Sequence, residues 1–552
     1  MAGGKEISSQ EGTTQGDNLA GPFYALGTTL LQNKLRETSP EIKQVWLADD
    51  ATGGGSITNL KSWWDTIINE GVKFGYHVNE NKSWLILKDP SKIQLARDTF
   101  QGTAINFTTE GMRHLGAALG SEDFKTRYVS DKVAKWCEEI HQLAEIAKSQ
   151  PQAAYAAFTH GERHRFSYFM RTIPGMKDLI QPLDDVINKE LIPAILGNDT
   201  FSPIDRELFS LPLRFGGLGL PVFSSIAEEE YLISKQLTAP LTTIMFMQGT
   251  NIPDTNEVAV IKRAITTDKE ASLKHRAALV HDRLPETTAK AMKQASAKGV
   301  SSWLSVIPLA EHSFTLNKGE FRDALAICYN KPLSDLPSHC PCGDQYDLNH
   351  ALNCKRGGFV IMRHDNVRDF EANLLRKICN DVETEPRLQR LEGEGVDGLV
   401  GDDARPDIRA KSAWRNAQNA FFDVCVTNTN SASQCHLTDE QVLKNHENEK
   451  KRAYNDRIMN IEHGTFTPLV FSVNGGAGPE ADRLHKHLAD KISQKTGDRY
   501  SHVMAMIRCK LSFLILRACL TCLRGSRRRN PADGDANIED FDMAYRDARL
   551  FD

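Results

Sequence analysis

Residues 45–55 read VWLADDATGGG, so two adjacent aspartates, Asp49 and Asp50, follow directly on an apolar run. Aspartate is uncommon in strands and is rarely buried without a partner, so the pair needs a physical reason. The small residues and glycines that follow it favour a tight turn. The alternative is that the two carboxylates bind a hard cation such as Mg²⁺, which prefers oxygen ligands.

The segments on either side of this pair have a regular order. Residues 43–50 predict a strand that runs into a turn, and apolar residues at helical spacing predict a helix over 57–71 that ends at a glycine. Residues 72–88 then predict a strand, an asparagine-rich turn and a second strand. This order is typical of the palm of a template-dependent polymerase, in which carboxylates on a hairpin hold two Mg²⁺ ions for phosphoryl transfer.

Four further motifs accompany the aspartate pair in a fixed order. The five stretches are GTTQGDNLAGPFYAL (12–26), WLADDAT (46–52), GYHVNENKSWLILK (75–88), RHLGAALG (113–120) and LPLRFGGLGL (211–220). In order and spacing the chain resembles motifs B to E and the thumb of a non-LTR retrotransposon reverse transcriptase, an RNA-directed DNA polymerase. The resemblance implies that Gln15 and Gly16 lie near the template and the nucleotide, and that Asp49 and Asp50 bind the metal ions. It also implies that Lys82 lies near the phosphates, and His114 and Gly116 near the primer.

The sequence departs from this family before motif B. A working polymerase needs another metal-binding aspartate on an upstream strand, whereas the resemblance begins only at about residue 11. We therefore expect an N-terminally truncated polymerase domain that does not synthesise DNA. Leu47 also replaces the usual aromatic residue before the first aspartate. Basic and aromatic residues between 160 and 169 are expected either to contact an RNA–DNA duplex or to form a solvated helix face.

Residues 340–354, CPCGDQYDLNHALNC, contain the spacing C-x-C-x7-H-x3-C. Three thiolates and one imidazole form a closed tetrahedral set that suits structural Zn²⁺ and leaves no open position for catalysis. The predicted ligands are Cys340, Cys342, His350 and Cys354. Because the C-x-C spacing is tight, His339 is an alternative ligand. The other alternative is a group of buried free cysteines beside a capping histidine.

A helix and a strand with acidic residues follow this cysteine–histidine segment. The helix within 363–382 has an apolar stripe, and His364, Arg368 and Glu371 share another of its faces, so Glu371 is expected near the acids that follow this helix. Downstream, Pro406-Asp407 precedes an alternating segment that predicts a half-buried strand with Asp423 on its polar face. This arrangement resembles the PD-(D/E)xK core of restriction-like endonucleases, in which carboxylates and a lysine hold Mg²⁺ and activate water.

The lysine of that core is displaced in this sequence, because Cys425 occupies its position. In the retrotransposon form of the nuclease a following helix supplies the lysine, and residues 438–458 predict such a helix with a Thr438–Gln441 capping box. Lys450 or Lys451 is the expected replacement, unless both belong to a charged solvent face. Arg363 and His364 match an Arg-His motif that precedes this nuclease, and the resemblance implies that they contact nucleic acid.

The bulk composition limits the class of protein. The net charge of −5 is that of the tail 531–552 alone, which has seven acidic and two basic residues, so overall charge does not indicate a partner. The longest apolar stretch is too short to span a membrane. Eleven cysteines, an odd number, argue for a reducing compartment, hence a nuclear or cytoplasmic protein.

We predict an α/β (α+β) protein with Mg²⁺ and Zn²⁺ as cofactors, and with RNA template and DNA target as partners. A parent protein of this kind would nick DNA and copy RNA from the freed 3′ end. The alternatives are a non-catalytic nucleic-acid-binding relic and a zinc-stabilised interaction scaffold. The expected order is a partial palm (1–120), thumb (121–235), helical linker (236–330), zinc knuckle (331–360), restriction-like endonuclease (361–530) and acidic tail (531–552).

Overall fold

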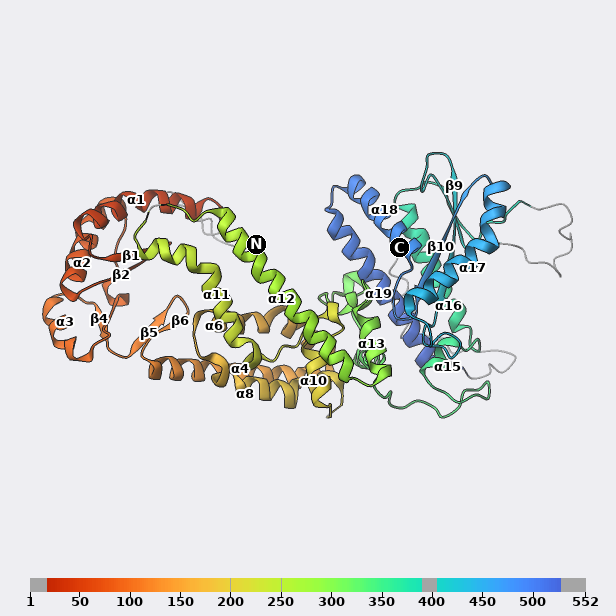
Figure 1. Cartoon of the computed structure of the whole chain (residues 1–552), viewed down its shortest axis with the longest axis horizontal. Coiled ribbons are helices and arrows are strands. Elements are labelled where there is room, and N and C mark those ends of the chain that lie inside the picture. Colours follow the sequence, from red (N-terminus) through yellow and green to blue (C-terminus); the bar gives the residue numbers. More distant parts are fainter. Residues whose placement is uncertain (1–16, 199, 250, 390–404, 528–552) are drawn as a thin grey trace, which may run out of the picture. The chain divides into compact units, whose positions relative to one another are not determined.

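A computed structural model describes residues 17–198, 200–249, 251–389 and 405–527 (Figure 1). Helices predominate beside small sheets, which confirms the predicted mixture of helix and sheet. Gln15, Gly16 and the acidic tail lie outside the described residues. The chain forms two compact units: an N-terminal unit of Met1–Cys137, Arg165–Asp184 and Phe223–Glu270, and a C-terminal unit of Glu138–His164, Asp185–Val222 and Ala271–Asp552.

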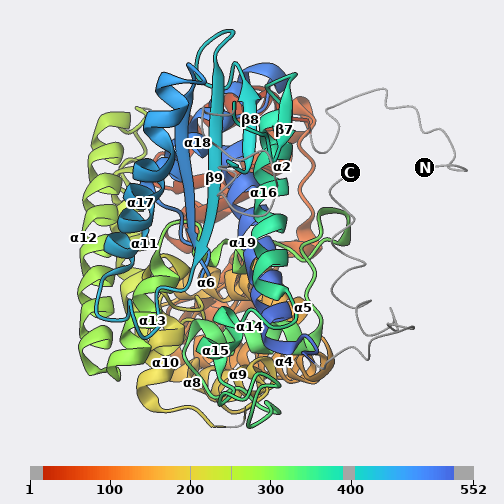
Figure 2. The same cartoon turned by 90° about the vertical axis from the view of Figure 1, so that its right-hand side faces the viewer.

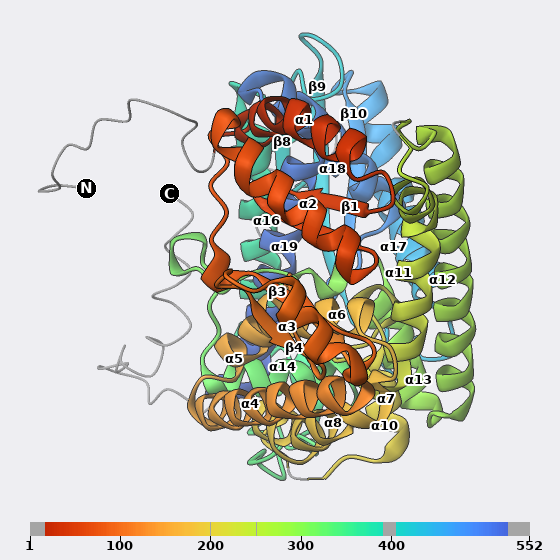
Figure 3. The same cartoon turned by 90° about the vertical axis from the view of Figure 1, so that its left-hand side faces the viewer.

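The N-terminal unit begins with a helix and a β-hairpin that carries the aspartate pair. Leu47 pairs with Asp50 across the hairpin, so Ala48 and Asp49 form a two-residue turn, with Ala48 at a φ of 52°. The predicted strand and the predicted helix ending at Gly71 are both confirmed. The elements are α1 (Ala20–Thr38), β1 (Lys43–Leu47), β2 (Asp50–Gly54) and α2 (Ile57–Gly71), and Leu31, Leu35, Trp63 and Ile67 form the core between them (Figure 3).

The hairpin predicted over 72–88 is wrong. Val72–Phe74 (η1) and Glu80–Lys82 (η2) are short 3₁₀ turns, and only Trp84–Ile86 (β3) is a strand. After α2 the chain reverses where Gly75 adopts a φ of 72°, which takes the following residues away from an extended course. β3 instead pairs in parallel with β4 (Asn106–Thr108), beyond η3 (Pro90–Lys92) and α3 (Ile93–Thr99).

A second hairpin and several helices complete the N-terminal unit. β5 (Gly111–His114) and β6 (Ala117–Gly120) are antiparallel, and Leu115 and Gly116 form their turn with φ values of 48° and 88°. α4 (Glu122–Ser149) and α12 (Thr255–Arg283) each have residues in both units. Between them lie α6 (Arg163–Thr172), α7 (Met176–Leu179), α8 (Gln181–Val186) and α11 (Phe223–Phe246), of which α6 and α8 also have residues in both units.

The C-terminal unit contains a group of short helices. Pro151 occupies the first turn of α5, so α4 ends at Ser149 and a separate helix begins there. π-helical turns η4 and η5 precede α6 and α9, and 3₁₀ turns η6, η7 and η8 join others. The bounds are α5 (Pro151–Ala157), η4 (Phe158–Glu162), η5 (Ile187–Leu191), α9 (Ile192–Leu196), α10 (Pro203–Ser210), η6 (Leu213–Phe215), α13 (Glu286–Ser296), η7 (Val300–Leu304), η8 (Ala310–His312) and α14 (Lys318–Cys328).

A four-stranded sheet organises the remainder of this unit, in the order β10-β9-β8-β7 (Figure 2). β9 runs parallel to β10 and antiparallel to β8. One face of the sheet packs against three helices through Phe422, Val424, Leu469 and Phe471, and the other face meets one helix through Phe421 and Phe466 (Figure 1). The strands are β7 (Val382–Thr384), β8 (Ile408–Lys411), β9 (Asn419–Thr427) and β10 (Thr465–Ser472); the three helices are α16 (Phe359–Arg376), α18 (Pro479–Thr496) and α19 (Tyr500–Arg524), and the single helix is α17 (Asp439–Asn460).

Two sequence predictions for this sheet meet different outcomes. The capping box of Thr438 and Gln441 is present and begins α17, as predicted. The prediction that Asp423 lies on the polar face of a half-buried strand is wrong, because β9 is a central strand covered on both faces and Asp423 is only 3% exposed. Among the helices of the described residues, none is both long and apolar enough to cross a lipid bilayer.

Candidate metal centre and candidate active site

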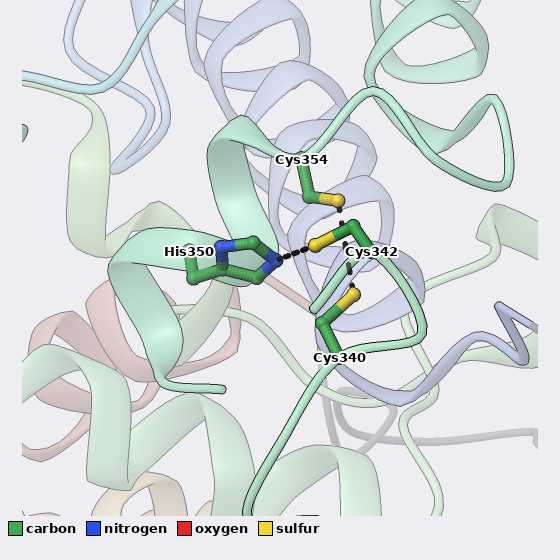
Figure 4. A group of neighbouring side chains, drawn as sticks. All are labelled: Cys340, Cys342, His350 and Cys354. Atoms are coloured by element: carbon green, nitrogen blue, oxygen red, sulfur yellow. Dashed lines mark hydrogen bonds between the residues drawn. The ribbon is translucent and has the colours of Figure 1, made fainter. Parts of the chain in front are cut away.

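The four predicted zinc ligands converge on one point in the C-terminal unit (Figure 4). Their ligand atoms all lie within 4.8 Å of one another. Cys340 Sγ is 3.8 Å from Cys354 Sγ, and Cys342 Sγ is 3.4 Å from His350 Nε2. A tetrahedral Zn²⁺ with ordinary bond lengths separates two sulfurs by about 3.8 Å and a sulfur and a nitrogen by about 3.6 Å. The four ligand atoms are therefore close enough to one another to hold a zinc ion.

Local sequence explains why these ligands meet. Gly343 adopts a φ of 106° and its N–H donates to the Cys340 carbonyl, which closes the turn between the first two cysteines. Asp347 caps the N-terminus of α15 (Leu348–Asn353) by accepting from the His350 N–H at 2.6 Å. One helical turn then separates His350 from Cys354.

The alternative ligand His339 is not part of the cluster. Its Nδ1 lies 3.2 Å from Ser338 Oγ, and its side chain is exposed. Burial disfavours the thiolate of Cys340, but hydrogen bonds from the neighbouring ligands outweigh it and lower the pKa of Cys340 to about 7. A backbone N–H favours the thiolate of Cys342, but desolvation and the neighbouring thiols outweigh it and raise the pKa of Cys342 to about 11. The cluster therefore gives up a first proton readily and holds the others more tightly. Of the open alternatives, the set with His350 is the one that the geometry supports.

A second group of predicted residues meets at the centre of the sheet. Ile408 pairs with Phe422 across β8 and β9, Asp407 directly precedes β8, and the charge of Asp407 acts on the Asp423 carboxylate. Asp407 Oδ2 accepts from the Val424 N–H at 2.6 Å, which fixes this carboxylate at the edge of β9. The two acids of the PD-type motif therefore lie on neighbouring segments of the sheet.

The helix after the sheet supplies one lysine to this acidic pair. Lys450 Nζ lies 2.8 Å from Asp423 Oδ2, and Lys450 also approaches the ring of Tyr454. Lys451 pairs instead with Glu480 at the start of α18. Of the two lysines that the sequence left open, only Lys450 points at the site. Its charge also acts on Cys425, the residue that occupies the usual lysine position.

Burial and charge perturb the ionisation of this group. Burial raises the pKa of Asp423 to about 6, and the nearby Asp407 carboxylate adds to this while Lys450 opposes it. His364 Nε2 is 3.2 Å from Asp407 Oδ2, and this hydrogen bond raises the pKa of His364 to about 9 against the effect of burial. Two cationic side chains thus hold two desolvated carboxylates.

These two acids offer a partial ligand set for Mg²⁺. Both acids make their ion pairs through Oδ2, which lies 3.2 Å from His364 Nε2 for Asp407 and 2.8 Å from Lys450 Nζ for Asp423. Oxygen is the ligand that Mg²⁺ prefers, and it usually retains several waters, so two carboxylates are enough to fit it. Cys340, Cys342, His350 and Cys354 remain the only cluster of three or more potential ligands within the described ranges.

Glu371 and Arg363 lie elsewhere. Glu371 is fully buried on the opposite face of the sheet from Asp423, where its Oε1 lies 2.8 Å from His485 Nε2 of α18. Arg363 is 2% exposed and donates to the Leu352 carbonyl of α15 at 3.1 Å. These positions do not support a catalytic role for Glu371 or a nucleic-acid contact for Arg363. The sequence did not indicate His485 as the partner of Glu371, because no local pattern links α18 to α16.

In the N-terminal unit the predicted residues are at the surface. Asp49 and Asp50 lie at the exposed tip of the β1–β2 hairpin, and the Asp49 carbonyl accepts from Tyr76 Oη at 2.9 Å. Burial and these acids raise the pKa of Tyr76 to about 12. The sequence did not indicate the contact between Tyr76 and Asp49. Lys82 is exposed in η2. His114 ends β5 and Gly116 lies in the β5–β6 turn; both are half-buried, and the Gly116 carbonyl accepts from Tyr128 Oη at 3.1 Å.

No protein-family model and no curated protein matches this chain.

Proposed function

We propose that the C-terminal unit is a Mg²⁺-dependent DNA endonuclease of the restriction-like type, stabilised by a structural zinc ion. The observation that carries this proposal is the meeting of three side chains from separate segments. The charge of Asp407 acts on Asp423, and Lys450 reaches Asp423 from α17. Two acids on neighbouring segments of a sheet and one lysine beside them are the functional groups that phosphodiester hydrolysis with Mg²⁺ uses.

Each side chain has a distinct task in this proposal. Asp407 and Asp423 would hold the cation, while the Val424 N–H and His364 keep the Asp407 carboxylate in place. Lys450 stabilises negative charge on the attacked phosphate and helps to orient the attacking water. Bound Mg²⁺ would supply Lewis acidity and a lowered pKa for water. Lys450 supplies the positive charge that Cys425, which occupies the usual lysine position, cannot supply.

The N-terminal unit is proposed to derive from a reverse-transcriptase palm. The support is the exposed Asp49-Asp50 pair at a hairpin tip, followed by a second tight turn at 114–117. On this account the partners are an RNA template and a DNA target, and the protein acts in the nucleus or cytoplasm. A non-catalytic nucleic-acid-binding relic is the alternative, favoured by Cys425 in the lysine position.

The test is nicking of supercoiled plasmid by the full chain with Mg²⁺. We expect open-circular product from the wild type and none from Asp423→Asn, with equal DNA binding by both in a gel-shift assay. Asp369→Asn is the matched control, because Asp369 is an exposed acid whose partner is Arg368. DNA binding without nicking by the wild type would reject the endonuclease and favour the relic.

A further inference from the structure

We infer that Arg363 is a positioning residue that ties the candidate zinc knuckle to the Asp407 carboxylate. This inference rests on the proposed endonuclease for its functional consequence but on geometry for the link itself. The link runs from helix α15 of the knuckle through Arg363 and His364 of α16 to Asp407. Each connection along this route is a contact between described side chains or backbone groups.

The first connection is between the knuckle and α16. Arg363 Nη1 donates to the Leu352 carbonyl at 3.1 Å, and Leu352 lies between the ligands His350 and Cys354. The guanidinium is buried and lies 4.0 Å from Cys522 Sγ of α19. Within the described part of the chain, no carboxylate pairs with it. A buried arginine held by a carbonyl and a thiol is an uncommon arrangement, because burying an unpaired charge is costly.

The charge of a loaded knuckle accounts for this arrangement. Zn²⁺ with three thiolates and a neutral imidazole carries a net charge of about −1. A second buried cation, Arg527, also lies against the knuckle and donates to the Ala351 carbonyl at 3.0 Å and to Tyr346 Oη at 2.8 Å. Two buried guanidiniums therefore flank a cluster whose metal-bound form is anionic. The occupied knuckle offsets charges that the empty knuckle leaves uncompensated.

The second connection is between α16 and the acidic pair. His364 follows Arg363 directly, and consecutive residues point about 100° apart around a helix. Arg363 thus faces α15 and α19 while His364 faces β9, where its Nε2 lies 3.2 Å from Asp407 Oδ2 and 3.2 Å from the Val424 carbonyl. The turn of helix that anchors the knuckle is the turn that orients Asp407. Loosening of α15 would move His364 and release the carboxylate.

Zinc removal from the unmodified full chain tests the link without any substitution. We expect amide hydrogen exchange across residues 359–366 to accelerate by about tenfold or more after chelation, while exchange in α17 stays unchanged. Equal exchange across 359–366 with and without zinc would overturn the inference.

Substitution of Arg363 gives the second test. With zinc still bound, Arg363→Ala should weaken Mn²⁺ binding at Asp407 and Asp423 by about tenfold, as measured by electron paramagnetic resonance, and Arg363→Lys should recover part of the loss. Arg376→Ala is the matched control, since Arg376 is an exposed arginine in the last turn of the same helix. Wild-type Mn²⁺ affinity in Arg363→Ala would overturn the positioning role. If the wild type binds no Mn²⁺ but its exchange depends on zinc, the endonuclease proposal fails and the link stands.

Discussion

Lys450 in α17 lies 2.8 Å from Asp423 in β9, although a loop and three helical turns separate them in the sequence. The adjacent Lys451 points away and pairs with Glu480. Because a helix turns by about 100° per residue, only one of two consecutive side chains can face a given strand. The rotation of α17 about its own axis, as it packs on the sheet, therefore decides which lysine contacts the acidic pair.

This orientation of α17 predicts that substitution of the two lysines has different effects on the rate of nicking. Lys450→Ala should lower the rate of plasmid nicking by on the order of a hundredfold, because removing a group that stabilises transition-state charge has effects of that size. Lys451→Ala should nick at close to the wild-type rate, since Lys451 contacts Glu480 and not the acids. Initial rates of both variants at saturating Mg²⁺ provide the comparison. The reverse order of activities would show that α17 packs on the sheet with Lys451, and not Lys450, facing the acids.

The zinc site predicts one metal ion per chain. Cys354→Ser should purify with little zinc and with an early unfolding transition, because structural zinc contributes its binding energy to folding. His339→Ala should retain the full zinc content, since His339 faces Ser338 and not the cluster. Metal analysis of the two variants distinguishes the ligand sets. Loss of zinc from His339→Ala with retention in His350→Ala would refute the ligand assignment.

Four ligands within fifteen consecutive residues explain why the zinc site could be predicted from the sequence. A turn and a single helix bring them together, so no distant pairing is required. The predicted hairpin over 72–88 failed for the opposite reason. The partner of β3 is β4, which follows after another helix, and pairing of that kind leaves no local sequence signal.

His364 predicts a pH-dependent contribution to stability. Its pKa is raised to about 9 from a usual value of 6.5, so the protonated ring is favoured in the folded state. The stabilisation is complete below pH 6.5 and disappears as the pH rises through 9. His364→Gln should therefore lower the free energy of unfolding by about 1–2 kcal/mol at pH 6, with allowance for the partly exposed ring. Urea denaturation at pH 6 and at pH 10 checks this. An equal deficit at both values would contradict the assigned ion pair.

We expect Glu371 to have a structural role and no role in metal binding or catalysis. Glu371→Ala should destabilise the protein by about 3 kcal/mol, because it leaves His485 buried without its partner. The variant should still bind Mn²⁺ with wild-type affinity under conditions where it is folded. Chemical denaturation and a Mn²⁺ titration give the two readouts. A stable variant that no longer binds Mn²⁺ would instead place Glu371 among the metal ligands.

Sequence reasoning put Glu371 near the acids because it shares a helix face with His364. Seven residues along α16 correspond to about 10 Å, and over that distance the same helix face meets different neighbours. His364 lies beside β9, whereas Glu371 lies against α18. The period of a helix can be read from its residues, but the elements packed along its length cannot. The same limit explains why Arg363 was predicted to contact nucleic acid and is instead buried against α15.

The most direct test of the central claim is anomalous diffraction from crystals of the full chain soaked with Mn²⁺. The account predicts one anomalous peak at about 2.0–2.4 Å from a carboxylate oxygen of Asp407 and from one of Asp423, with Lys450 alongside. Asp407→Asn crystals should lose the peak, and the zinc signal at Cys340, Cys342, His350 and Cys354 should remain. The absence of any peak between the two carboxylates, in crystals that retain the zinc signal, would contradict the account.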